Sequence, residues 1–210
     1  MALRLNGQTT GYTELNAPAN GDSVILTMPG TDGNAGEYLQ TNGSGTLSWQ
    51  TVTVPDNLTI GTAADATSQG SITYSNIPSG TKRITLLVSG LTMTANTYRP
   101  IVRIGSGGST VSTGYSSRSA YNTAAASHTN GFELYYWGIS ANTLSAKMSL
   151  ENINGNTWVS SHVGASNGWG TVQYGGGYIT LAGTLDTIEL TTTSTGTFAQ
   201  GTVNVIYEAA

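Results

Sequence analysis

The chain has 210 residues, a formal net charge of −4, 9% charged residues and 28 glycines. It contains no cysteine, which excludes disulfide bonds and thiolate metal sites. Helix formers are scarce, and the abundant Thr, Val, Ile and Tyr suit a pleated sheet, so the composition predicts an all-β protein.

The first residues, MALRLNG, lack the basic region and the long apolar region of a secretory signal peptide. No apolar run approaches the roughly 20 residues needed to span a bilayer. We therefore expect synthesis in a cytoplasm without a standard export signal, and no membrane insertion. The sequence has no excess of Lys and Arg, so nucleic acid is not an expected partner.

Residues 1–60 predict an extended arm of short strands and turns. Its apolar pieces are brief, and Gly, Pro, Asn and Asp fill the connectors between them. The expected strands are 12–15, 24–28, 38–40 and 47–49. The last two form a predicted hairpin, GEYLQTNGSGTLSW, because the Asn and Gly residues of its turn accept positive φ angles.

This arm is too thin to enclose its own apolar side chains, and leaving each one in water forgoes roughly 1.5–3 kcal/mol. The side chains concerned are Leu15, Val24, Leu26, Met28, Leu39, Leu47 and Trp49. Chains wound side by side would bury them against one another. We therefore expect self-association or docking through the arm. The arm also carries five acids against one base, typical either of a solvated segment or of one that docks on a basic surface.

Residues 61–69 have little apolar content and predict a linker, and residues 70–210 predict a head domain. In KRITLLVSGL, Ile84, Leu86 and Val88 fall on one face and alternate with polar residues. The stretches 144–151 and 202–208 alternate in the same way, and further strands are expected at 98–104, 132–139, 157–163, 178–181 and 185–191. Such strands predict a jelly-roll-like antiparallel β-sandwich, large enough to stand alone.

Convergent catalytic groups are not evident in the sequence. His128 and His162 have no metal-ligand partner at useful spacing, and we expect them in a surface loop and on a strand face. Asp186 and Glu189 fall on opposite faces of one predicted strand. Glu133 and Glu151 stand isolated among apolar neighbours. We expect no enzymatic activity, no metal and no cofactor.

Two polar stretches are candidates for recognition. Residues 164–178 have the composition of an exposed loop, and 105–130 that of a binding loop or a flexible excursion. We expect Trp158 and Tyr178 in the core; the other aromatics either contact a glycan or fill the ends of the sandwich. The candidate glycan contacts are Trp169, Tyr174, Tyr115, Tyr121 and Arg118. Arg118 belongs to a run of basic residues that either cluster or scatter over the surface.

The arm, GYTELNAPANGDSVILTMPGTDGNAGEYLQTNGSGTLSW, resembles stem segments of tailed-bacteriophage fibre and related virion proteins. The pattern "L-tLP…dG-ttGq-L-tnGsGtLsW" recurs in that family, and Met28 stands here where Leu is usual. The matching residues are Leu26, Met28, Pro29, Asp32, Gly33, Gly36, Leu39, Asn42, Gly43, Ser44, Gly45, Leu47, Ser48 and Trp49. The stretches SGTKRITLLVSGLT, LENINGNTWVSSHVGA, GTLDTIELTT and GTVNVIYE are similar, more loosely, to the C-terminal β-sandwich of phage structural proteins.

The resemblance implies a homotrimer on the exterior of a phage particle, made in the bacterial cytoplasm. Its arm would attach to other virion proteins of the tail or capsid, and its head would face outward toward a host surface glycan. Two alternatives stay open: a short fibre or fibre tip, and a capsid decoration protein whose arm clamps the shell. An enzyme acting on envelope polysaccharide is a third alternative.

Overall fold

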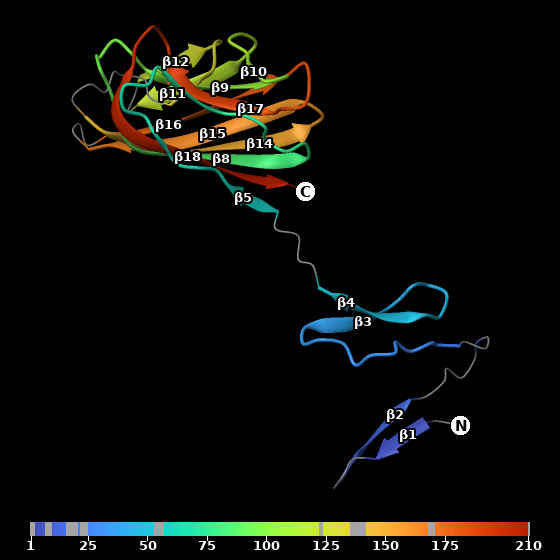
Figure 1. Ribbon diagram of the computed structural model, residues 1–210. Coiled ribbons are helices and arrows are strands. Elements are labelled where there is room, and N and C mark those ends of the chain that lie inside the picture. The colour runs from blue at the N-terminus through green and yellow to red at the C-terminus, as the bar shows by residue number, and fades with distance from the viewer. Residues whose placement is uncertain are drawn as a thin grey trace. The chain divides into compact units, whose positions relative to one another are not determined.

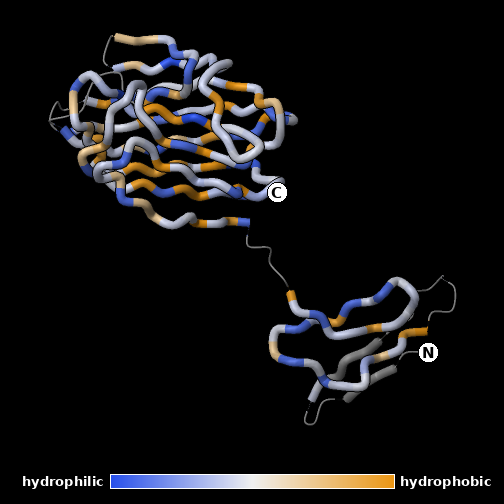
Figure 2. Tube along the Cα trace, turned by 45° about the horizontal axis from the view of Figure 1, so that its top comes forward, coloured by the Kyte–Doolittle hydropathy of each residue, from blue (hydrophilic) through white to orange (hydrophobic). Residues whose placement is uncertain are grey.

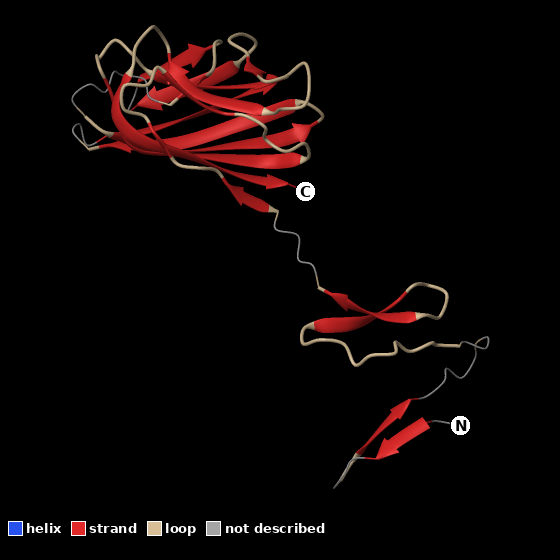
Figure 3. Ribbon diagram, viewed as in Figure 1, coloured by secondary structure: helices blue, strands red, loops and turns tan. Residues whose placement is uncertain are grey.

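The computed structural model describes residues 3–6, 10–15, 21, 25–52, 57–121, 124–134, 142–167 and 171–209. It divides into two units, Met1–Pro55 and Asp56–Ala210. All regular structure in these ranges is β-strand, and every strand pair is antiparallel (Figure 3), which confirms the all-β prediction. The described residues include no helix long and apolar enough to cross a membrane.

The N-terminal unit contains two hairpins. Strand β1 (Leu3–Asn6) pairs with β2 (Tyr12–Leu15), and β3 (Glu37–Thr41) pairs with β4 (Leu47–Thr51). In the β3–β4 turn, Gly43 and Gly45 have φ angles of 82° and 88°, and the side chain of Asn42 accepts the Ser44 N–H at 2.8 Å. The predicted 36–49 hairpin is confirmed.

The indole of Trp49 fixes a preceding loop against this hairpin. Its Nε1–H donates to the Thr31 carbonyl at 2.8 Å, and its ring lies over Gly33. A Cβ atom on Gly33 would stand 2.6 Å from the ring, and φ there is +71°, so this position requires glycine. Trp49 therefore has a partner within its own unit.

The C-terminal unit is a sandwich of two sheets, which lie face to face in Figure 1. The larger sheet has the strand order β12-β11-β16-β15-β14-β8-β18-β5, with β6 also on β18. Its strands are β5 (Leu58–Ile60), β6 (Ala64–Asp65), β8 (Thr81–Met93), β11 (Ser116–Tyr121), β12 (Ala124–His128), β14 (Leu144–Asn154), β15 (Thr157–Ser166), β16 (Thr171–Thr180) and β18 (Phe198–Ala209).

The smaller sheet has the order β10-β9-β17-β7, and β13 also pairs with β9. Its strands are β7 (Ser71–Tyr74), β9 (Pro100–Ser106), β10 (Ser109–Thr110), β13 (Phe132–Glu133) and β17 (Thr187–Thr192). Together the two sheets confirm the predicted antiparallel sandwich.

The apolar core lies between the sheets, and hydrophobic and hydrophilic residues alternate along many head strands in Figure 2. On β8, Ile84, Leu86 and Val88 are buried as the alternation predicts. Buried residues of β14 and β18 continue this face, and Ile104 and Ile188 belong to the same core from the smaller sheet. The side chains buried from one face of each strand thus form a single core.

The head begins earlier than the sequence predicts. Strands β5 and β6 both pair with β18, and Ala66 is fully buried with its N–H bonded to the Gly201 carbonyl at 2.8 Å. The expected linker over residues 61–69 is therefore wrong. Strand β6, which lies in this stretch, has only two residues and shows no periodicity in the sequence. It is held by its hydrogen bonds to β18.

The two faces of β8 provide a test of this register. We expect Leu86→Ala to lower the free energy of unfolding by about 2–5 kcal/mol, because Leu86 is 1% exposed and truncation leaves a cavity. Leu87→Ala is the matched control on the same strand, where the side chain is 37% exposed, and we expect a much smaller loss. Urea unfolding measures both. Equal losses would contradict the register.

Candidate functional site

The outer face of the larger sheet presents two tyrosines that flank a glycine. Tyr174 and Tyr178 on β16 are each 53% exposed, and Gly176 lies between them on the same side of the strand. Gly176 pairs with Arg118 on β11 and with Ser161 on β15. We call Arg118, Ser161, Tyr174, Gly176 and Tyr178 the β11–β16 face. Side chains are thus absent from the middle of this face and stand around it.

A depression of about 460 Å³ opens on the β11–β16 face. Its lining combines one guanidinium, one exposed aromatic ring and several hydroxyl groups. The lining residues are Tyr115, Ser116, Ser117, Arg118, Ser127, His128, Thr129, Gly176, Gly177 and Tyr178. Ser116, Ser127 and Thr129 are exposed, so their hydroxyl groups are open to a ligand. This volume lies in the lower part of the ordinary range for small-molecule sites.

Glycines allow the strands around this depression to approach closely. A Cβ atom on Gly176 would stand 2.6 Å from the Ser160 carbonyl oxygen, and one on Gly177 would stand 2.3 Å from the Ser116 carbonyl oxygen. A side chain at either position would force the backbone apart. The GGG sequence of β16 therefore has a packing reason, and it leaves the floor of the depression bare.

Arg118 differs from the other arginines of the head in its partners. Arg83 lies 3.2 Å from Glu208, Arg99 lies 2.9 Å from Glu133, and the Arg103 side chain donates to the Asn130 carbonyl. Within the described part of the chain, Arg118 makes no ion pair. No acid among the described residues therefore compensates its positive charge.

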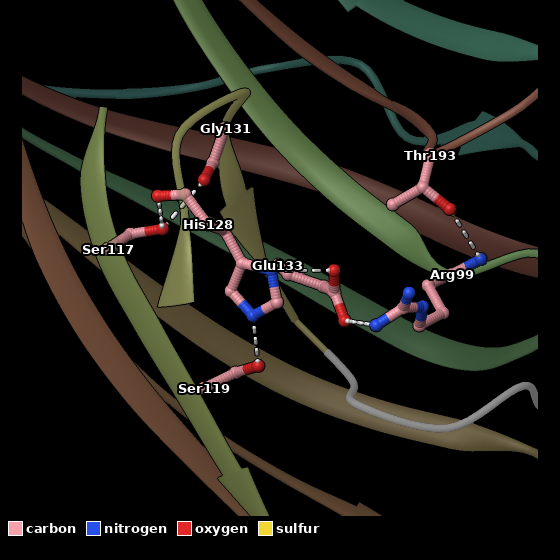
Figure 4. Close-up of polar contacts among 7 residues, drawn as sticks. All are labelled: Arg99, Ser117, Ser119, His128, Gly131, Glu133 and Thr193. Atoms are coloured by element: carbon pink, nitrogen blue, oxygen red, sulfur yellow. Dashed lines mark hydrogen bonds and ion pairs between the residues drawn. The ribbon is translucent and has the colours of Figure 1, made fainter. Parts of the chain in front are cut away.

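A chain of polar contacts lies on the inner side of the same strands (Figure 4). The Nε2 atom of His128 lies 2.9 Å from the Ser119 hydroxyl, and its Nδ1 atom lies 3.0 Å from Glu133 Oε2. Glu133 Oε1 in turn accepts from Arg99 at 2.9 Å. These contacts join β11, β12 and β13 to Arg99, the residue that precedes β9. Ser117 adds a hydrogen bond to the Gly131 carbonyl at 2.7 Å.

Burial shifts the titration of these groups. Desolvation raises the pKa of Glu133 to about 7, although the Arg99 guanidinium opposes the shift. Desolvation lowers the pKa of His128, with a further contribution from Arg99. It also lowers the pKa of His162 on β15 to about 4, and the neighbouring His128 adds to that shift. Imidazole at both sites is therefore neutral at pH 7.

The Ser119–His128–Glu133 contacts have the connectivity of a catalytic triad, in which a base contacts a nucleophile and an acid orients the base. Ser119, however, is 0% exposed and points between the sheets from the middle of β11. A substrate cannot reach this hydroxyl in the structure described. The geometry favours a positional role, in which the three side chains hold neighbouring strands together.

Of the predicted contact residues, Arg118 lines the depression from an exposed position and Tyr115 from a buried one, whereas Tyr174 lies outside the lining. Arg118 and Tyr174 both belong to the β11–β16 face. Tyr115 is 3% exposed and its hydroxyl bonds to the backbone of Ile104, so the expected surface contact is wrong. Tyr121 is half-buried at the end of β11. Trp169 lies outside the described residues.

Several expectations about these stretches need correction. Residues 105–130 are not a loop but contain β10, β11 and β12, and most of 164–178 lies in β15 and β16. Trp158 is buried as predicted, whereas Tyr178, also expected in the core, is exposed. His128 is buried rather than on the surface, and Glu133 is paired rather than isolated. The alternation in SSRSAY could have indicated strand β11. It was missed because small polar residues, Ser117 and Ser119, take the inward positions.

The remaining acids and histidine have structural surroundings. His162 is a strand residue as expected, but it faces inward and is 6% exposed. Asp186 accepts the N–H groups of Gly107 and Gly108 at 2.8 and 3.1 Å, and Glu189 accepts the Thr110 hydroxyl. Both carboxylates therefore brace the turn between β9 and β10.

The N-terminal unit leaves much of its apolar surface open. Leu26 is 58% exposed, Met28 is 61% exposed and Leu39 is 37% exposed, while Leu47 and Trp49 are half-buried. Leu15 lies in β2, and Val24 lies outside the described residues.

Comparison of the chain with protein-family models, curated proteins and solved structures gives no match.

The two buried titrations have opposite effects on stability. His162 has a folded pKa near 4 against an ordinary 6.5, so the unfolded chain binds the proton first and stability falls as the pH drops below about 6.5. Glu133 has a folded pKa near 7 against 4.5, so the folded chain holds the proton longer and stability falls as the pH rises from about 4.5 to 7. In the unmodified chain the Glu133 trend opposes the His162 trend between pH 4.5 and 6.5, and the lowered pKa of His128 acts in the same direction as that of His162.

We expect Glu133→Gln to expose the histidine trend, so that this variant loses on the order of 2 kcal/mol between pH 6.5 and 4.5. His162→Gln removes the His162 trend and leaves that of Glu133. This variant should therefore gain stability as the pH falls from 6.5 to 4.5. Urea unfolding at pH 4.5, 5.5 and 6.5 measures both slopes. Two variants with the same pH dependence would contradict these assignments.

Proposed function

We propose that this chain is a non-enzymatic structural protein of a tailed-bacteriophage virion, a homotrimeric short fibre or fibre tip. Its N-terminal unit attaches to other virion proteins, and its head faces outward and contacts a glycan of the host surface. The observation that carries this proposal is the contrast between the two units. The head encloses a core of its own, while the N-terminal unit exposes the apolar side chains that a partner would cover.

Exposure in the N-terminal unit supports a role in association. Ile25 is 82% exposed, and Leu26 and Met28 are more than half exposed on the segment that bridges to the hairpin at Thr27. Two-stranded hairpins are marginal alone in water. A cluster of exposed apolar residues on such a weak support indicates an interaction surface.

The residues of the phage-like motif support the same proposal, because each has a definite role in the backbone turns or on the surface of the N-terminal unit. Gly33, Gly36, Gly43 and Gly45 all have positive φ angles, which their turns require. Trp49 covers Gly33 and bonds to Thr31. These motif residues shape the backbone, and the motif leucines and Met28 are the ones left available to other chains.

A second candidate is a capsid decoration protein. The N-terminal unit is separate from the head, and residues 1–60 carry five acids against one base, which fits an arm clamped on a basic shell surface. Copy number distinguishes the two, because a fibre is present in tens of copies per particle and a shell ornament in hundreds. Quantitative protein analysis of purified particles measures it.

The oligomeric state tests the first proposal. We expect the full chain to show three times its mass of 21.7 kDa by multi-angle light scattering, because association buries the apolar residues of the N-terminal unit. The double change Leu26→Asp and Met28→Asp should shift the protein toward monomer. Ile153→Asp, at a head position with 66% exposure, serves as the control and should leave the trimer intact.

A full chain that stays monomeric across micromolar concentrations would overturn the trimer. If the double variant at Leu26 and Met28 associated as well as the unmodified chain, the interface would have to lie on other residues.

A further inference from the structure

The lining of the depression on the β11–β16 face combines hydroxyl groups with apolar surface. Ser116, Ser127 and Thr129 are exposed around it, and Tyr178 presents a ring with an apolar body and a polar tip. An apolar peptide segment would leave these hydroxyl groups without hydrogen-bond partners. A sugar, which offers hydroxyl groups on its rim and C–H groups on its faces, matches both parts of the lining.

The charge of this site selects among sugars. Arg118 has no ion pair within the described residues, and no acidic residue lines the depression. Two acids on the same sheet face, Glu151 and Glu208, lie beside Arg83 at 3.7 and 3.2 Å. An uncompensated guanidinium among neutral hydroxyl groups favours an oxyanion, which it holds by charge-assisted hydrogen bonds.

The spacing of the groups fits one ring with one substituent. Tyr174 and Tyr178 are four residues apart on one strand, roughly 13 Å, and Gly176 leaves the space between them open. Arg118 sits opposite Gly176 on the adjacent strand, roughly 5 Å away in backbone terms. A ring lying against Tyr178 therefore places its substituent within reach of Arg118.

We propose that the β11–β16 face binds a saccharide bearing a carboxylate or phosphate group. Arg118 holds the anionic group, Tyr178 packs against the sugar ring, and the hydroxyl groups of Ser116, Ser127 and Thr129 bond to its rim. This inference rests on the proposed attachment function and names the class of glycan that the head contacts.

Isothermal titration of the full chain with four probes tests it. The probes are a hyaluronan tetrasaccharide, mannose 6-phosphate, neutral maltotetraose and inorganic phosphate. We expect one of the two anionic saccharides to bind at least tenfold more tightly than maltotetraose and phosphate, and to weaken as NaCl rises from 50 to 500 mM. The carboxylated and phosphorylated probes separate the two sources of the anion.

Variants locate the binding. Arg118→Gln and Tyr178→Ala should each lower the affinity about tenfold or more, and Arg118→Lys should fall between, because it keeps the charge and loses the fork. The control is Lys147→Gln, which removes an exposed cation from β14 on the same sheet face and should change nothing. The side chains of Arg118, Tyr178 and Lys147 are all exposed, so we expect the four variants to fold, which a thermal unfolding curve checks.

Several results would overturn the inference. If maltotetraose or inorganic phosphate bound as tightly as the anionic saccharides, the proposed ligand class would be wrong. If Arg118→Gln bound the saccharide with full affinity, the proposed site would be wrong. An Arg118→Gln variant that changes oligomeric state and not saccharide binding would assign this face to a contact between chains. A monomer that binds an anionic saccharide through Arg118 would refute the trimer alone, and a trimer that binds none of the probes would refute this inference alone.

Discussion

The buried carboxylate of Glu133 is the contact on which the end of the head formed by β11, β12 and β13 depends. It lies between the Arg99 guanidinium and the His128 imidazole. His128 in turn shares a hydrogen bond with Ser119 of β11. Since side chains alternate along a strand, an inward Ser119 makes Arg118 face outward. A shift of one residue in β11 would exchange these two side chains and place a charge between the sheets.

This end of the sandwich is held by polar contacts where the other end is held by apolar packing. Tyr115 bonds to the backbone of Ile104 on the smaller sheet, and its ring meets Phe132 edge to face at 4.9 Å. Ser117 and Ser119 take inward positions that leucine or valine occupy on β8. Buried polar networks of this kind lose stability sharply when one member is removed, so they specify a unique strand arrangement at the cost of pH sensitivity.

The sequence indicated the apolar half of the head and the N-terminal hairpin, because alternation on β8 and the Asn-Gly turn are local signals. It indicated only the end of β16, within the expected strand 178–181, and neither β11 nor β12, since inward residues such as Ser117, Ser119 and His128 look like loop composition. The Glu133–His128 contact joins strands whose proximity is fixed only by the packing of the two sheets. Tyr178 was misplaced for a related reason, because its face depends on the register of β16 against β11.

A crystal structure of the full chain soaked with the tighter-binding anionic saccharide tests the central claim most directly. The account predicts density for a sugar ring against Tyr178, with its oxyanion within hydrogen-bond distance of Arg118 and the Ser119–His128–Glu133 contacts intact beneath. Saccharide bound elsewhere on the head, or the β11–β16 face covered by a neighbouring chain of the oligomer, would contradict it.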